Sequence, residues 1–318
     1  MLLHGCYLLS EDRPIVSTAD AFVGDLAQRL PKSVPLTVFA FHTWATETPT
    51  ELYYSYKKVR SFSRKRLAHM CNSRKEQRNL GLLGRNAYFC HHNLFCDESK
   101  LVLGSSEKEF DAIYIAQMAP FKRVELAGQV ERLRIVAANP PILKDKLEQF
   151  GVPNAQANQD RLNREEISAA IGGAHCGLAL SAVEGGMLAS AEYLLCGVPI
   201  VSTPSRGGRD AWYTERNHIL CEPTIPGVSN AVRAAVAKDW DAAQIRSDAI
   251  ARCREHREQL AQAVRAFGGT PRFEPATMTG SWFPQNFIQV FFLEEFLNSW
   301  NGSRFTKTEL IGRVKESL

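Results

Sequence analysis

Short apolar runs alternate along the chain with longer segments of helical periodicity. The short runs are rich in β-branched residues and bounded by turn residues, which predicts buried strands at 35–44, 110–117, 132–138, 175–181, 198–204 and 218–223. The longer segments predict helices at 19–30, 51–70, 122–131, 141–150, 164–172, 187–196, 227–237 and 240–266. Alternation of this kind is typical of parallel sheets with helices on both faces, so the expected fold class is α/β.

The regularity of the alternation changes along the 318 residues, which suggests two domains. Residues 1–108 are less regular and predict a smaller α/β domain, whereas residues 109–270 predict a longer series of strands and helices. Residues 271–318 are rich in aromatic side chains, with helical spacing from about 284 to 300. We expect this last stretch to be a helical segment that packs back across both domains.

The composition is that of an ordinary globular protein, with 45% apolar and 23% charged residues. A net charge of +4 is too small to indicate nucleic-acid binding by itself. No apolar run is long enough to cross a bilayer, and no basic segment precedes the N-terminal apolar residues as in a signal peptide. The eight cysteines are scattered, as expected for free thiols in the cytoplasm.

The stretch 181–212, SAVEGGMLASAEYLLCGVPIVSTPSRGGRDAW, places two glutamates around a Gly-Gly pair. Gly185 and Gly186 follow a predicted strand and precede a predicted helix, where backbone N–H groups carry partial positive charge and suit a phosphate. Each carboxylate can accept two hydrogen bonds from a diol, Glu192 from a ribose and Glu184 from a second polyol. Either glutamate alone is more often solvated, and Gly-Gly alone is more often a turn; the ordered combination favours a ligand site at the carboxyl ends of the strands.

The same stretch resembles the donor site of retaining glycosyltransferases of the GT-B fold, family 4 above all. The shared pattern is two glutamates separated by seven residues, then LLCGVPIVST and a second Gly-Gly. Upstream, YIAQMAPFKRVELA resembles the family's strand, loop and helix with a Pro-x-Lys. The resemblance covers about 108–225 and extends more loosely over 68–108. It implies two facing Rossmann-like domains, of which the N-terminal, acceptor-side domain is shortened here.

The resemblance also implies roles for individual residues. Glu192 would hold the nucleotide ribose, and Glu184 would hold hydroxyl groups of the transferred sugar. Gly186 and Met187 would offer backbone N–H groups near the sugar and the phosphates. Lys122 would neutralise the charge that builds on the diphosphate leaving group. No metal or other cofactor is implied, because a nucleotide-diphosphate sugar is the donor substrate and Lys122 and the helix terminus supply the positive charge.

Two departures from the family pattern concern the N-terminal half and the diphosphate. The family's first Gly-Gly loop, near the N-terminus, is absent. Gln117 stands where the family has an arginine, five positions before the lysine. Arg123, where the family has a glycine, or Arg206 can replace the lost cation. We therefore expect Gln117 and Arg123 to lie at the diphosphate.

Histidines and cysteines in the first hundred residues raise two further hypotheses. His42 ends the predicted strand 35–44, and the resemblance implies that a histidine there lies near the transferred sugar. With Lys122 and Glu184 it completes the expected catalytic set. The run CHHNLFC at 90–96 lacks the spacing of a zinc site, so no metal site is expected.

Residues 57–85 form a basic stretch, with ten Lys or Arg against one acid. In the predicted helix over 51–70, one face would carry Tyr53, Tyr56, Val59, Leu67 and Met70. A basic helix with aromatic residues can lie on an anionic membrane surface, and a solvated basic face is the alternative. A recognised nucleic-acid-binding module is lacking, which disfavours nucleic acid.

The resemblance thus implies a retaining, metal-independent glycosyltransferase that moves a sugar from a nucleotide-diphosphate sugar to a saccharide or lipid-linked acceptor in polysaccharide or cell-envelope biosynthesis. It would be cytoplasmic, with peripheral contact at the inner face of the membrane as a further hypothesis. A sugar-nucleotide epimerase shares this fold and is one alternative. A degenerate, non-catalytic nucleotide-binding scaffold is the other, suggested by Gln117 and the short N-terminal domain.

Overall fold

The structure is a computed structural model and describes residues 3–20, 23, 36–59, 66–105, 107–142, 144–285 and 287–290. Contacts divide the chain into two compact units. Unit 1 comprises Met1–Phe95 and Cys253–Leu318, and unit 2 comprises Cys96–Arg252. The three expected segments, 1–108, 109–270 and 271–318, remain predictions.

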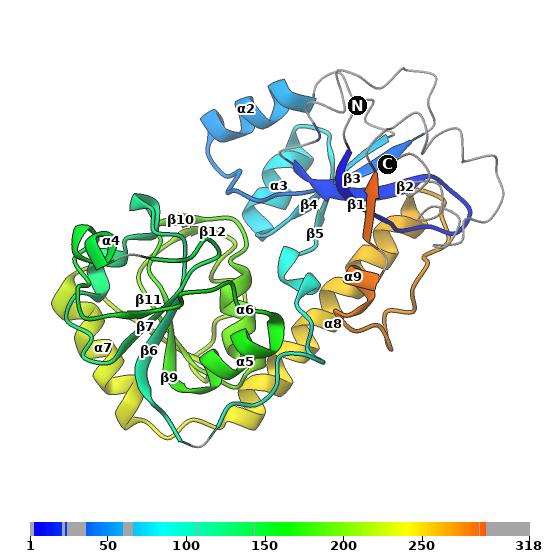
Figure 1. The fold of residues 1–318 in the computed structure, drawn as a ribbon. Helices are drawn as coiled ribbons and strands as arrows, with labels where there is room; N and C mark the ends of the chain where they lie inside the picture. The colour runs from blue at the N-terminus through cyan, green and yellow to red at the C-terminus, as the bar shows by residue number, and fades with distance from the viewer. Residues whose placement is uncertain are drawn as a thin grey trace. The chain divides into compact units, whose positions relative to one another are not determined.

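Unit 1 is built on a six-stranded sheet in the order β14-β1-β2-β3-β4-β5 (Figure 1). The strands are β1 (Leu3–Leu8), β2 (Ile15–Ala19), β3 (Thr37–Phe41), β4 (Leu67–Cys71), β5 (Asn86–Phe89) and β14 (Phe287–Val290). Strands β2 to β5 run parallel, and β1 is antiparallel to both β2 and β14. The inner strands β3 and β4 are buried on both faces, as is usual in parallel sheets. Their core side chains include Phe39 and Met70, which belong to one buried cluster with Leu260 and Val264 of α8 (Ala242–Ala266).

The remaining helical elements of unit 1 have between 4 and 11 residues each. They are α2 (Pro49–Val59), α3 (Arg74–Leu82), the 3₁₀ helix η2 (His92–Phe95) and α9 (Trp282–Gln285). Helix α8 begins in unit 2 and ends in unit 1, and its span agrees with the helix predicted over 240–266.

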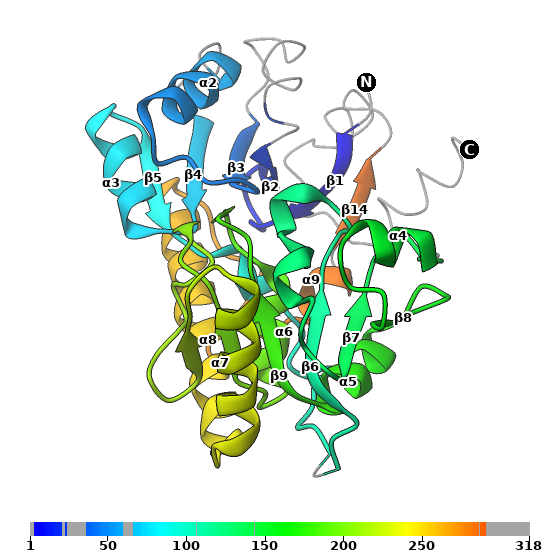
Figure 2. The same ribbon diagram turned by 90° about the vertical axis from the view of Figure 1, so that its left-hand side faces the viewer.

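Unit 2 contains a six-stranded parallel sheet in the order β13-β11-β9-β6-β7-β8. The strands are β6 (Phe110–Ile115), β7 (Leu133–Val136), β8 (Gln156–Ala157), β9 (Ala174–Ala179), β11 (Ile200–Ser202) and β13 (His218–Leu220). Figure 2 shows β6 between β7 and β9. A small parallel pair, β10 (Val183–Glu184) and β12 (Arg206–Gly207), lies in the loops after β9 and β11.

Helices cover both faces of the unit 2 sheet (Figure 1). They are α4 (Lys144–Gln149), α5 (Arg164–Gly172), α6 (Leu188–Leu195), α7 (Ile225–Ala237) and the first half of α8. Helix α5 starts where the sequence predicts, since Asn163 accepts from the Glu166 N–H and the Glu166 side chain accepts from the Asn163 N–H in a capping box. Every strand predicted from the sequence is present, so the α/β class is confirmed.

Three of the predicted helices are wrong in part. The helix expected over 51–70 ends at Val59, and Leu67–Cys71 form β4, fully buried between β3 and β5. The helix expected over 122–131 is replaced by two 3₁₀ segments, η3 (Pro120–Lys122) and η4 (Val124–Ala127). Their junction, Arg123, has a φ of 50°, which an α-helix does not allow.

The third correction concerns the C-terminal segment. The helix expected from about 284 to 300 contains a strand, because 287–290 pair with β1 as β14. The rest of that segment, and most of the helix expected over 19–30, lie outside the described residues. The packing of 271–318 across both domains therefore remains a prediction.

The proposed membrane-binding face changes with these corrections. Leu67 and Met70 are buried in β4, so they cannot share an exposed helix face with Tyr53 and Tyr56. Tyr53 and Tyr56 themselves are exposed on α2. Among the described helices, none is both long and apolar enough to span a bilayer. Contact of 57–85 with an anionic membrane remains a prediction.

Gly177 in the middle of β9 gives a direct test of the packing in unit 2. A Cβ atom at Gly177 would lie 2.2 to 2.6 Å from ring atoms of Tyr193, whose hydroxyl oxygen accepts from the Ile115 N–H. Gly177→Ala is therefore expected to lower the free energy of unfolding by about 1–3 kcal/mol, measured by urea denaturation. Gly173→Ala is the matched control, because its nearest contacts are at 3.7 Å. Equal effects of the two changes would contradict the packing described.

Candidate functional site

The strand order of unit 2 identifies a crevice before any side chain is considered. The first strand, β6, lies in the middle of the sheet, with β7 and β8 on one side and β9, β11 and β13 on the other. The chain goes from β6 to β7 on one side and from β9 to β11 on the other, so the loops after β6 and β9 diverge. Such a topological switch point, at the carboxyl ends of the strands, is where open α/β sheets bind ligands.

Lys122 and Glu184 meet at this point. Lys122 lies in η3 after β6, and Glu184 lies in β10 after β9. The Lys122 Nζ donates to both carboxylate oxygens of Glu184 at 2.8 Å. The two side chains are only 10% and 12% exposed, so water screens their attraction weakly. Sixty-two positions separate them in the sequence, and only the adjacency of β6 and β9 brings them together.

The backbone around Lys122 is held from two directions. The hydroxyl of Tyr114 in β6 donates to the Lys122 carbonyl oxygen at 2.6 Å. The next residue, Arg123, donates from Nε to the Leu180 carbonyl at 2.5 Å and from Nη2 to Thr203 Oγ1 at 2.6 Å. Arg123 thus ties the loop after β6 to the ends of β9 and β11, and burial lowers its pKa. Its expected contact with a diphosphate remains a prediction.

Helix α6 begins directly after the Gly-Gly pair, as the sequence predicts. Gly185, Gly186 and Met187 are buried, and Met187 is the N-cap residue, with an extended backbone. A side-chain cap is lacking at this end of α6, and the first turn contains no acidic residue. The N–H groups of that turn are thus left without a side-chain acceptor, and they carry the positive end of the helix dipole.

Glu192, one turn into α6, is buried and forms an ion pair with Arg164, the first residue of α5. Burial raises the pKa of Glu192, and the Arg164 guanidinium opposes that rise. Arg164 itself is half exposed. The partner of this buried carboxylate thus reaches solvent, and a ribose diol at Glu192 would share the carboxylate with Arg164.

A pocket of about 620 Å³ opens where the loops after β6 and β7 meet α4. Its volume lies within the roughly 300–1,000 Å³ of small-molecule sites. Gln117, which is exposed at the end of β6, lines it together with Asn139, Asp145 and Lys146. The buried Asn158 side chain fixes the neighbouring loop by bonding the Ala137 N–H and carbonyl. Of the residues predicted for the site, only Gln117 lines this pocket.

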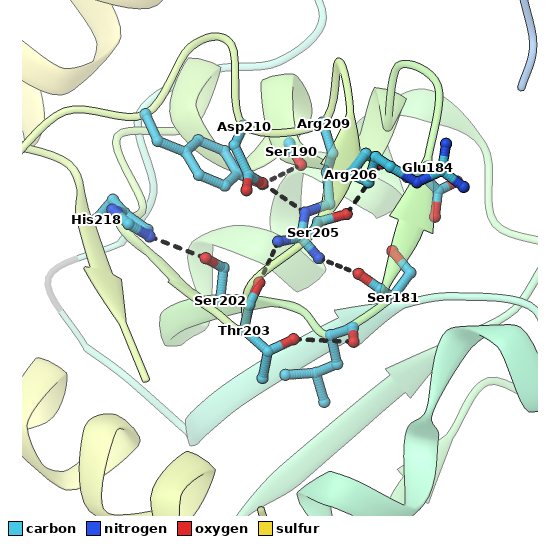
Figure 3. A network of polar contacts seen from close by, with 12 residues as sticks. Ser181, Glu184, Ser190, Ser202, Thr203, Ser205, Arg206, Arg209, Asp210 and His218 are labelled. Carbon is cyan, nitrogen blue, oxygen red and sulfur yellow. Dashed lines mark hydrogen bonds and ion pairs between the residues drawn. The ribbon is translucent and has the colours of Figure 1, made fainter. Parts of the chain in front are cut away.

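Arg209, which was not predicted for the site, holds the loops around Glu184 together (Figure 3). Its side chain is buried after β12, where Nη1 donates to the Ser181 carbonyl at 2.5 Å and Nη2 donates to the Thr203 carbonyl. Its Nε donates to Asp210 at 2.6 Å. Ser181 follows β9 and Thr203 follows β11, so Arg209 connects the loops at the carboxyl ends of these two strands. The sequence gives no signal for it, because an arginine after Gly-Gly is normally solvated.

His42 lies in unit 1, directly after β3, and is buried. Its Nε2 is 3.0 Å from His69 Nδ1, and its Nδ1 is 3.0 Å from Thr46 Oγ1 and from Glu76 Oε1. Its expected catalytic role remains a prediction. The seven cysteines whose side chains the structure describes carry free thiols. In the described part of the chain, His, Cys, Asp and Glu side chains do not form any group of three or more that could bind a metal.

Solved structures of similar fold were found, although no protein-family model and no curated protein matches the sequence. HepE from Anabaena, solved with UDP-glucose, has a TM-score of 0.55 at 14% identity, over 73% of this chain and 72% of that one. Sucrose-phosphate synthase from Thermosynechococcus elongatus has a TM-score of 0.54 at 15% identity, over 86% and 73%. The UDP-forming α,α-trehalose-phosphate synthase from Burkholderia vietnamiensis has a TM-score of 0.53 at 12% identity, over 73% and 69%.

The likeness confirms the expected fold, with two Rossmann-like α/β domains of the GT-B type. Identities this low show the fold alone, since one fold hosts many activities. Membership of family 4 remains a prediction.

Proposed function

We propose that the chain is a glycosyltransferase that binds a nucleotide-diphosphate sugar on unit 2 and transfers the sugar to a saccharide or lipid-linked acceptor. The observation that carries this proposal is the Lys122–Glu184 ion pair at the switch point. A nearly buried ammonium group suits a diphosphate, and the carboxylate beside it suits sugar hydroxyls. Retention of configuration, independence of metals and a role in cell-envelope polysaccharides belong to the same proposal and rest on the resemblance over 108–225.

In the proposed reaction the bound donor separates the ion pair and becomes the new partner of both side chains. The diphosphate takes the place of the Glu184 carboxylate at Lys122 Nζ, and Glu184 then accepts hydrogen bonds from the sugar. When the bond between the anomeric carbon and the diphosphate breaks, its electron pair leaves with the diphosphate. Lys122 and the first-turn N–H groups of α6 stabilise that charge. The acceptor hydroxyl oxygen forms the new bond to the anomeric carbon, and its proton passes to the departing diphosphate.

The nucleoside is assigned to Glu192 and the neighbouring loops. Glu192 accepts from the ribose diol while its carboxylate stays paired with Arg164. The 620 Å³ pocket, with Gln117 in its lining, has the volume for a nucleoside. Solved structures with a similar fold contain UDP or UDP-glucose, which supports a uridine nucleotide as the first ligand to test.

Thermal unfolding in the presence of UDP, GDP, ADP, CMP and dTDP tests the proposal. A nucleotide at a hundred times its dissociation constant is expected to stabilise the wild type by about 2.7 kcal/mol. Glu192→Gln is expected to lose most of that response, because the neutral amide offers one acceptor oxygen in place of two. The matched control is Glu165→Gln on α5, an exposed glutamate paired with Lys100.

The outcomes separate the alternatives. If none of the nucleotides stabilises the wild type, or if both glutamate variants respond like the wild type, the proposed donor site is wrong. If one nucleotide binds, its sugar conjugates are incubated with and without saccharide acceptors and followed by NMR. Transfer gives a new glycosidic bond with the donor's anomeric configuration, an epimerase gives an altered nucleotide sugar, and a scaffold gives neither.

A further inference from the structure

Exposed aromatic and aliphatic side chains gather on α2 and at the C-terminal end of α3 in unit 1. Tyr53, Tyr54 and Tyr56 on α2 are 60%, 59% and 47% exposed. Leu82 and Leu83 at the end of α3 are 81% and 45% exposed. Figures 1 and 2 both show the two helices next to each other on unit 1. Single exposed apolar residues are common on protein surfaces, whereas a cluster of this kind indicates an interaction site.

Arg85 connects the tyrosines to the leucines. Its Cζ lies 5.0 Å from the centre of the Tyr56 ring, so the turn after α3 lies against α2. In that turn the backbone N–H groups of Gly84 and Arg85 donate back to carbonyls in the last turn of α3, and Gly84 has a φ of 66°. Leu82 and Leu83 are therefore held at the tip of a tight turn, where they reach solvent.

Basic residues surround these side chains, and the acidic residues of the same helices face the backbone or the core. Lys57 is exposed on α2, and Arg78 is exposed on α3 one turn before Leu82. One oxygen of Glu51 accepts from two backbone N–H groups, and Glu76 is only 2% exposed. The surface is therefore both apolar and positive. It is called the α2–α3 patch below and comprises Tyr53, Tyr54, Tyr56, Lys57, Arg78, Leu82, Leu83 and Arg85.

This combination fits an anionic lipid surface better than the other candidate partners. Leucines at a turn tip can be buried among acyl chains, tyrosine rings favour the headgroup level, and anionic headgroups attract Lys and Arg. A nucleic acid would use the basic side chains and the aromatic rings, but it would leave Leu82 in water. A second copy of this chain would bring two positive surfaces together, and these repel each other.

We propose that the α2–α3 patch docks on the surface of an anionic membrane, with Leu82 and Leu83 inserted among the lipid chains and the basic residues at the phosphate groups. This surface replaces the single helix face expected over 51–70, part of which is buried in β4. The proposal does not depend on the proposed function, because docking requires neither nucleotide nor saccharide. Both are left out of the test, so docking and the donor site can fail separately.

Cosedimentation of the full chain with vesicles of phosphatidylglycerol and phosphatidylcholine in equal parts tests the proposal. Binding is expected at low salt and is expected to be lost with pure phosphatidylcholine, which lacks the anionic headgroups. Leu82→Asn is expected to weaken binding about tenfold, equivalent to about 1.4 kcal/mol. Leu220→Asn is the matched control, because Leu220 is 59% exposed but belongs to β13 in unit 2.

A second pair of variants tests the contribution of charge. Arg78→Gln is expected to weaken vesicle binding about fivefold at low salt, equivalent to about 1 kcal/mol, and less as salt is added. Arg233→Gln is the matched control, because Arg233 is exposed on α7 in unit 2. All four residues are exposed, so each variant is expected to fold, which thermal unfolding checks.

Each of the following results would overturn the proposal. The wild type does not bind the anionic vesicles at low salt, or Leu82→Asn and Leu220→Asn weaken binding equally. Binding that depends on Arg78 and not on Leu82 would mean adsorption without insertion. Binding of a generic oligonucleotide in place of vesicles would assign the patch to nucleic acid, and dimers that Leu82→Asn abolishes, without vesicle binding, would assign it to a second copy.

Discussion

Replacement of Lys122 by methionine is expected to lower the free energy of unfolding by about 3 kcal/mol, because it leaves the Glu184 carboxylate in a nearly buried position without a counter-charge. Methionine has a similar length and keeps the contact with neighbouring apolar atoms, so the loss reports the charge. Equilibrium urea denaturation measures it. Glu184→Gln leaves the ammonium unpaired and is expected to destabilise as well.

The double variant Lys122→Met, Glu184→Gln provides the control. It removes both charges, and its stability is expected to return to within about 1 kcal/mol of the wild type, since a buried ion pair contributes little net stability. Additive losses in the double variant would show that the two charges are not coupled, contrary to the geometry.

The same variants separate the structural from the functional role of the pair. Inorganic pyrophosphate is expected to stabilise the wild type and to lose this effect in Lys122→Met. In Glu184→Gln it is expected to bind about tenfold more tightly, equivalent to about 1.4 kcal/mol, because the competing carboxylate is gone. Weaker pyrophosphate binding in Glu184→Gln would contradict the exchange of partners at Lys122.

Replacement of Arg209 by methionine is expected to cost about 4 kcal/mol of unfolding free energy. The Ser181 and Thr203 carbonyl groups would each lose a charged donor in a buried position, at roughly 1–3 kcal/mol apiece. Arg209→Lys is expected to recover less than half of the loss, because an ammonium group cannot reach both carbonyls in the planar geometry of a guanidinium. Urea denaturation followed by tryptophan fluorescence measures both.

Arg216→Met is the matched control for Arg209. Arg216 is 69% exposed and pairs with Asp248 at 3.1 Å, and such surface pairs contribute at most about 1 kcal/mol. If the Arg209 and Arg216 variants were equally stable, the carbonyl contacts in Figure 3 would not hold the two loops together.

The sequence by itself determined the elements whose signals are local. The helix over 164–172 has its cap and its periodicity within ten residues, and the structure has it at Arg164–Gly172. Five strands of unit 2, namely β6, β7, β9, β11 and β13, are apolar runs bounded by turns, so they too were predictable. Segment 67–71 was not, because an apolar run of five residues fits a helix face as well as a buried strand, and only pairing with β3 and β5 decides between them.

The residues of the candidate site were likewise predictable only in part. Glu184, Glu192 and the Gly-Gly pair before α6 could be singled out from their residue types and spacing, and Lys122 from the resemblance to the family's Pro-x-Lys. Their partners could not, because each partner depends on which strands and helices become neighbours. Strand order places Lys122 against Glu184 and Arg164 against Glu192, and the ends of β9 and β11 supply the carbonyls that bury Arg209. Long-range pairing is a property of the whole sheet, so only the tertiary structure decided which charges meet.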